Sequence, residues 1–254
     1  MALVLAFLIA AVLAPVLTRA LEASSLARTN HRGARIAAPL GLLILVPALP
    51  FLSIEPYVVF AVGVAVLGFV DDLAAGPVRG VRAHVGALLA GRPDTGALKA
   101  AGTAVLAAVT LRWQGLGGIR LVLAIGVLVL AAHAFNLLDL RPGRAIKVFA
   151  LLAIALLGVA ASVRPLLSLE PFLGPIAVVA VYDLRERGML GDTGASLLGA
   201  LAGLAAVATL PTAALAIAVV GLLVVAVYGE LRSISALIAS VPLLRCLDSV
   251  GRPA

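Results

Sequence analysis

Four aspartates stand at the ends of apolar runs in a chain that is 63% hydrophobic and only 12% charged. Asp71 and Asp72 close the run LGFVDDL, Asp139 follows FNLL, and Asp192 precedes TGASLLGAL. A charged side chain at mid-membrane costs roughly 2.5–3.5 kcal/mol on insertion scales, so such carboxylates need partners, water or a bound cation. Because no thiolate or histidine cluster accompanies these hard oxygen ligands, they favour Mg²⁺, with Mn²⁺ as the alternative, over Zn²⁺.

The Asp-Asp pair alone does not establish a metal site. In a simpler alternative, one carboxylate caps a helix or pairs with an arginine while its neighbour faces water. The stretch MLGDTGASLLG strengthens the functional interpretation, because Asp192, Thr193 and Ser196 lie at the start of an apolar run. Free N–H groups at a helix start attract anions, and Gly191 and Gly194 permit close backbone approach. By itself this stretch is also compatible with an ordinary capped helix.

The elements that must position these residues are membrane spans. A mean hydropathy of +1.19 over 254 residues and repeated apolar runs near bilayer length predict an all-α, polytopic membrane bundle that forms one domain, 1–254. We expect about nine spans, at 2–20, 36–54, 56–73, 98–113, 119–137, 146–163, 166–182, 193–210 and 212–228.

The positions of the cations predict the orientation. With the N-terminus outside and the C-terminus inside, sixteen of the 19 lysines and arginines fall on the inner side, as the positive-inside rule requires. Asp71, Asp72, Asp139 and Asp192 then all reach the inner face, so separate loops are expected to converge on one polar site. The single residues Arg112, Arg120 and Arg164 remain outside.

Two further segments have the pattern of helices that lie along the membrane surface, near 78–92 and 231–248. Both place apolar residues at helical spacing opposite arginines, and an ordinary surface helix is the alternative for each. The formal charge of +7 does not predict nucleic-acid binding, because no aromatic-interleaved basic patch or zinc-finger spacing is present.

The order of the acidic motifs resembles a known family. GFVDDL, FNLLDL and MLGDTGASLLG, on the inner face of a multispan protein, are similar to the polyprenyl-phosphate N-acetylhexosamine-1-phosphate transferases. The segment ARTNHRGARIAAPLG, 27–41, is similar to the family's first inner loop and places Asn30 at its asparagine, so the resemblance implies that Asn30 contacts the substrate. These motifs extend the resemblance from about residue 27 to 228.

The resemblance implies an enzyme of the bacterial cytoplasmic membrane that moves a phospho-sugar from a UDP-sugar to undecaprenyl phosphate in cell-envelope glycan synthesis, such as that of peptidoglycan. It implies catalytic roles for Asp71, Asp72 and Asp139, and Mg²⁺ binding by Asp192 together with Asp71. Asn136, matching the start of the family's Asn-x-x-Asp motif, is expected to contact the donor. Thr193 and Ser196 are expected to contact its phosphates. A homodimer is left open.

The chain also departs from the family pattern. After Asp139 the expected Gly-x-Asp-Gly is replaced by a segment containing Arg141 and Arg144, and no histidine follows His133, so the family's histidine-rich loop is missing. Arg141, Arg144 and Lys147 are candidates to bind phosphate directly, and topology signals are the alternative for each. The departures leave open a catalytically inactive homologue that binds a polyprenyl phosphate or lipid-linked sugar in a regulatory or scaffolding role.

Overall fold

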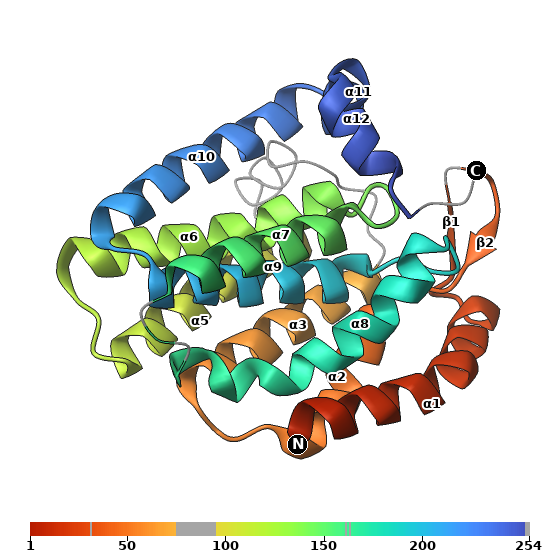
Figure 1. Cartoon of the computed structure of the whole chain (residues 1–254), viewed down its shortest axis with the longest axis horizontal. Coiled ribbons are helices and arrows are strands. Elements are labelled where there is room, and N and C mark those ends of the chain that lie inside the picture. The colour runs from red at the N-terminus through yellow and green to blue at the C-terminus, as the bar shows by residue number, and fades with distance from the viewer. Residues whose placement is uncertain (31, 75–94, 161, 163, 252–254) are drawn as a thin grey trace.

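The computed structural model describes residues 1–30, 32–74, 95–160, 162 and 164–251, and helices dominate it (Figure 1). The helices are α1 (Ala2–Ala23), α2 (Gly41–Ala48), α3 (Pro56–Ala74), α5 (Thr95–Trp113), α6 (Gly118–Leu138), α7 (Arg144–Val159), α8 (Glu170–Leu184), α9 (Gly191–Thr209), α10 (Thr212–Leu231), α11 (Ile234–Ser240) and α12 (Pro242–Ser249). Two 3₁₀ helices, η1 (Leu49–Phe51) and η2 (Arg164–Leu169), and a short antiparallel hairpin of β1 (Arg28–Thr29) and β2 (Arg35–Ile36) complete these elements.

The chain has the apolar helices of a multi-pass membrane protein. Within the described residues, six helical segments are long and apolar enough to cross a bilayer: Ala2–Ala23, Pro56–Ala74, Gly118–Leu138, Leu166–Leu184, Gly191–Thr209 and Thr212–Leu231. Each coincides with a span expected from the sequence, which confirms the all-α membrane class.

The three other expected spans fall on helices outside this group. The run 36–54 begins in extended chain, and its apolar helical part covers only Gly41–Phe51, about 16 Å at 1.5 Å per residue against a hydrocarbon core of about 30 Å. Pro47 and Pro50 lie at its end, where the α-helix gives way to η1. The run 146–163 overlaps α7, a 16-residue helix that ends at Val159, and 98–113 lies within α5, which carries Lys99 and Arg112. The number nine therefore stays a prediction.

Helix α9 lies at the centre of the bundle, in contact with α2, α3, α6 and α7 (Figure 1). Small residues make this close packing possible. A Cβ at Gly199 would lie 2.6 Å from the carbonyl oxygen of Ala131 and from the Cα of Ala132, on α6. Both glycines of GALAG, 199–203, therefore lie at the close contact between α9 and α6.

The chain before α2 runs beside the chain before α9. Ala37 and Gly188 form a parallel bridge, and the amide of Leu40 donates to the carbonyl of Met189 at 2.8 Å. These bonds bring the first loop to the N-terminal end of α9.

The two expected surface segments have different outcomes. The segment 78–92 lies outside the described residues, whereas the segment 231–248 forms α11 and α12 directly after α10. Both short helices lie near the end of the bundle that holds the β1–β2 hairpin (Figure 1).

Candidate functional site

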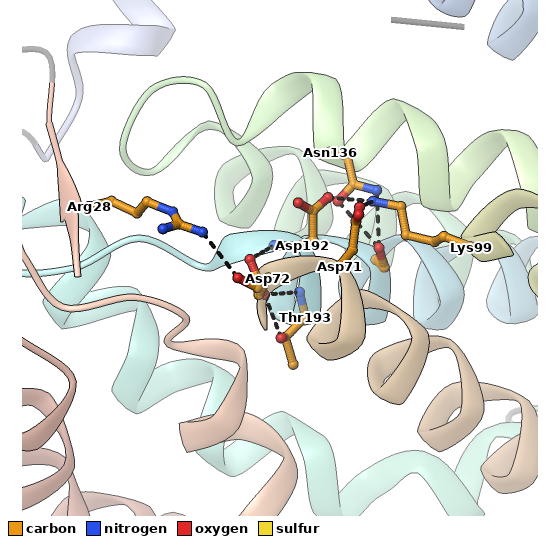
Figure 2. Close-up of polar contacts among 8 residues, drawn as sticks. Arg28, Asp71, Asp72, Lys99, Asn136, Asp192 and Thr193 are labelled. Carbon is orange, nitrogen blue, oxygen red and sulfur yellow. Dashed lines mark hydrogen bonds and ion pairs between the residues drawn. The ribbon is translucent and has the colours of Figure 1, made fainter. Parts of the chain in front are cut away.

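Asp72 caps the N-terminus of α9. Its Oδ1 accepts the backbone N–H of Asp192 at 3.0 Å, and its Oδ2 accepts the N–H of Thr193 at 2.8 Å and the Thr193 hydroxyl at 2.6 Å (Figure 2). The first N–H groups of a helix have no partner within the helix, so a carboxylate from α3 satisfies them here. Asp72 is only 6% exposed, and its contacts fix the end of α3 against the start of α9.

Two glycines permit this close approach. A Cβ at Gly68 would meet the carbonyl oxygen of Asp192 and would lie 2.9 Å from the Cα of Thr193. Gly191 has φ +68°, a conformation that residues with a side chain rarely adopt, and a Cβ there would lie 2.9 Å from both Asp72 carboxylate oxygens. The segment Gly-Asp-Thr, 191–193, therefore begins with a left-handed backbone conformation. Its backbone N–H groups are then close enough for the Asp72 carboxylate to accept their hydrogen bonds.

Lys99 links the carboxylates of Asp71 and Asp192. Its ammonium nitrogen lies 2.7 Å from Oδ2 of Asp71 and 2.5 Å from Oδ1 of Asp192 (Figure 2). The Lys99 and Asp71 side chains are each 18% exposed, and that of Asp192 is 37% exposed. Asp71 and Asp192, from different helices, therefore converge on one cationic group at a partly open position.

Asp139 approaches the same end of α9 from the C-terminus of α6. Its Oδ2 accepts the N–H of Gly191 at 3.0 Å, and the residue is 8% exposed. Burial raises the pKa of Asp139 well above its usual value, and the negative charges of Asp183 and Asp192 raise it further. The expected convergence of Asp71, Asp72, Asp139 and Asp192 on one end of the bundle is thus confirmed.

Asn136 and Ser196 form a hydrogen-bonded pair beside these carboxylates. The Asn136 amide nitrogen donates to the Ser196 hydroxyl at 3.0 Å, joining α6 to the second turn of α9. Ser196 is 1% exposed and Thr193 is fully buried. Direct substrate contact by these two hydroxyls stays a prediction, and the described contacts give both residues a positioning role.

The first loop contacts the site through Arg28 rather than Asn30. A guanidinium nitrogen of Arg28 donates to the backbone carbonyl of Asp72 at 3.1 Å, near the C-terminus of α3 (Figure 2). The Asn30 side chain instead accepts the backbone N–H groups of Arg32 and Ala34, both at 2.9 Å. Asn30 shapes the β1–β2 turn, and its expected substrate contact stays a prediction.

Arg144 and Lys147 hold the C-terminal helices. Arg144 donates to the two carboxylate oxygens of Asp248 at 2.7 and 3.0 Å and to the Ser235 hydroxyl at 2.7 Å. Lys147 donates to the carbonyl of Asp248 at 2.6 Å and to those of Leu247 and Val250 at 3.1 Å. Phosphate binding by Arg144, whose side chain is 7% exposed, would require this pair to break. Arg141 is partly exposed, and its expected phosphate contact stays a prediction.

The donor set can hold Mg²⁺ only in a limited way. Among the described residues, no group of three or more His, Cys, Asp or Glu side chains is arranged to hold a metal ion. Both oxygens of Asp72 accept hydrogen bonds from α9, whereas Asp71 and Asp192 both form ion pairs with the Lys99 ammonium. Mg²⁺ is commonly bound by one or two carboxylates together with water and substrate phosphates. Asp71 and Asp192 fit this mode of binding.

No protein-family model matches the chain, and a search of the curated proteins finds no match. The resemblance to the phospho-sugar transferases therefore rests on the sequence motifs alone.

Sequence reasoning gave Lys99 no role beyond topology. One signal was available: the chain has arginine at nearly all of its cationic positions, and Lys99 and Lys147 are its two lysines. A lysine near the start of an apolar helix is unusual in such a chain. Its pairing partners, however, come from α3 and α9, and neither can be deduced from the local sequence.

Proposed function

We propose that this chain is a phospho-sugar transferase that acts at the inner face of a bacterial cytoplasmic membrane. The substrates would be a UDP-N-acetylhexosamine and a polyprenyl phosphate such as undecaprenyl phosphate. The proposal depends on one observation. Asp71 and Asp192, which belong to motifs that resemble the transferase family, both form ion pairs with the Lys99 ammonium.

The proposed reaction exchanges one phosphoanhydride partner for another. An oxygen of the lipid phosphate attacks the β-phosphorus of the UDP-sugar and forms the new P–O bond. The bond between that phosphorus and the bridging oxygen breaks, and UMP leaves with the oxygen and its electron pair. Such transfers depend on in-line positioning and charge neutralisation more than on covalent chemistry by the protein.

We assign the carboxylates different roles in this proposed reaction on the basis of their contacts. Asp71 and Asp192 would hold Mg²⁺, or Mn²⁺, and a bound divalent ion would neutralise the donor pyrophosphate. Asp71 is also the better placed of the adjacent pair to orient the lipid phosphate, because Asp72 is buried and engaged with α9. Asp139 and Asn136 would position the donor from the end of α6, and the Lys99 ammonium supplies a positive charge beside both metal-binding carboxylates.

The test is release of UMP. The full chain in lipid nanodiscs that contain undecaprenyl phosphate is given Mg²⁺ and each of several UDP-N-acetylhexosamines. We expect turnover with at least one donor and its loss in Asp192→Asn. Glu55→Gln is the matched control, because Glu55 is an exposed acid beside the opposite end of α3, and it should retain activity.

A second candidate is a catalytically inactive homologue that binds the lipid phosphate. Lys99 favours it, because this ammonium already forms ion pairs with both carboxylates that would hold a metal. The absence of a histidine after His133 removes groups that the family resemblance leads us to expect. If no donor is turned over while undecaprenyl phosphate still raises the unfolding temperature, this candidate replaces the transferase.

A further inference from the structure

Helix α12 is amphipathic, and its described contacts with α7 run through Asp248 and the carbonyls at its C-terminal end. Leu243 and Leu247, one helical turn apart, lie on one face of α12 and are 69% and 46% exposed, and Val250, which directly follows the helix, is 57% exposed. Asp248 lies on the other side, where its carboxylate is paired with Arg144. Within the described part of the chain, no element buries the apolar side.

The attachment of the polar side is strong and specific. The Arg144–Asp248 pair uses two charge-assisted hydrogen bonds between side chains that are 7% and 14% exposed, the bidentate geometry that arginine forms best with carboxylates. Lys147 donates to three carbonyls at the C-terminal end of α12, where the helix dipole favours a cation. These contacts fix which face of α12 turns outward.

The position of α12 along the chain places it at a membrane surface. The apolar helix α10 ends at Leu231, and α11 begins at Ile234, so too few residues intervene for the pair to lie far from the end of a span. Figure 1 shows α12 running across the end of the bundle rather than continuing along α10. A short helix with one apolar face in this position matches an interfacial helix.

The exposed charges match an anionic lipid surface. Arg232, directly after α10, and Arg245, in the middle of α12, are exposed, whereas Asp248 is neutralised by Arg144. Arginines close to a membrane are attracted to anionic headgroups. Arg232 can therefore reach the headgroups at the end of α10, whereas Arg245, about 200° around α12 from Leu243, lies on the opposite face of that helix.

We propose that α12 docks on the anionic inner leaflet with Leu243, Leu247 and Val250 inserted at the headgroup boundary, while Arg144 and Lys147 hold it to the start of α7. The proposal is independent of the transferase reaction, because it concerns where α12 lies and not what the carboxylates do. It also gives Arg144 and Lys147 a function that needs no donor phosphate.

Cys246 provides the probe, since it is the single cysteine of the chain and is exposed on α12. The full chain, labelled there with a polarity-sensitive fluorophore, is placed in phosphatidylcholine nanodiscs with or without phosphatidylglycerol. We expect blue-shifted emission that nitroxides on lipid headgroups quench more strongly than nitroxides deep in the acyl chains. Phosphatidylglycerol should increase both the shift and the quenching.

Three variants separate docking from folding. Leu243→Gln combined with Leu247→Gln should return the emission to that of a dye in water, whereas Ser249→Gln, an exposed polar-side control, should not. Arg232→Gln should lower the ratio of docked to undocked helix about fivefold in phosphatidylglycerol discs and leave it nearly unchanged in phosphatidylcholine alone. Because these side chains are exposed, the bundle should keep its unfolding temperature.

Two results would overturn the proposal. The first is water-like emission from the unmodified sequence that neither nitroxide lipid quenches. The second is self-quenching of the fluorophore that rises when two chains share a disc, without lipid quenching, which would show that α12 pairs with a second copy. UMP release is not measured in either case, so a failure here leaves the transferase proposal intact.

Discussion

Asp71 and Asp72 are neighbours in sequence and should respond differently to the same substitution. Asp72→Asn replaces one carboxylate oxygen by an NH₂ group, so the donors on one side of the carboxylate, either the N–H of Asp192 or both donors of Thr193, lose their acceptor. Asp71→Asn weakens one contact to Lys99, which keeps its second contact to Asp192.

The geometry gives the size of each effect. A buried donor left without an acceptor costs about 1–3 kcal/mol, so Asp72→Asn should lower the free energy of unfolding by about 2 kcal/mol. At this chain length that corresponds to a fall in unfolding temperature of about 4–8 °C. Ion pairs with access to water contribute about 0–1 kcal/mol, so Asp71→Asn should lower the unfolding temperature by less than about 4 °C.

Thermal unfolding of both variants in one detergent, with UMP release measured in parallel, tests this difference. We expect Asp71→Asn to lose activity while remaining nearly as stable as the unmodified protein, and Asp72→Asn to lose stability first. Thr193→Val keeps the shape of a fully buried side chain and removes one hydrogen bond, so a cost of about 1 kcal/mol is expected. Equal unfolding temperatures for the two aspartate variants would refute the capping role of Asp72.

Three further predictions follow from the packing and charges of the site. Gly68→Ala should lower the free energy of unfolding by about 2 kcal/mol through overpacking against the α9 backbone, whereas Gly63→Ala, whose Cβ would meet only a leucine side chain, should cost less in the same unfolding assay. Lys99→Met removes the ammonium shared with Asp192. In chelator, the unfolding temperature of this variant should be lower than that of the unmodified protein, and added Mg²⁺ should raise it by a larger amount. Because the pKa of Asp139 is raised by burial, the folded state keeps a proton that the unfolded state releases above a pH of about 3.9. Stability measured in chelator should therefore fall as pH rises from that value towards the raised pKa, and Asp139→Asn should flatten this dependence.

The sequence was sufficient to predict which end of the bundle would carry the acids. Asp71 and Asp72 end one apolar run, Asp139 follows another and Asp192 begins a third, so alternating spans bring all of them to one side. The stretch GALAG, 199–203, has the small-xxx-small spacing that favours close helix packing, and α9, which carries it, packs closely on α6.

The division of roles at the site could not be predicted in the same way. Adjacent helical residues point in directions about 100° apart, and only the packing of α3 on α9 decides that Asp72 turns inward while Asp71 meets Lys99. Arg144 shows the same limit. Its partner Asp248 lies 104 residues further along the chain, so the local sequence offered only phosphate binding or topology as roles.

Binding of Mn²⁺, followed by electron paramagnetic resonance in the presence of UDP, tests most directly whether Asp71 and Asp192 form one cation site. We expect the unmodified chain and Glu55→Gln to bind the ion, and Asp71→Asn and Asp192→Asn each to lose most of the bound signal. Undiminished binding in both aspartate variants would contradict the account, because the ion would then be held somewhere other than between α3 and α9.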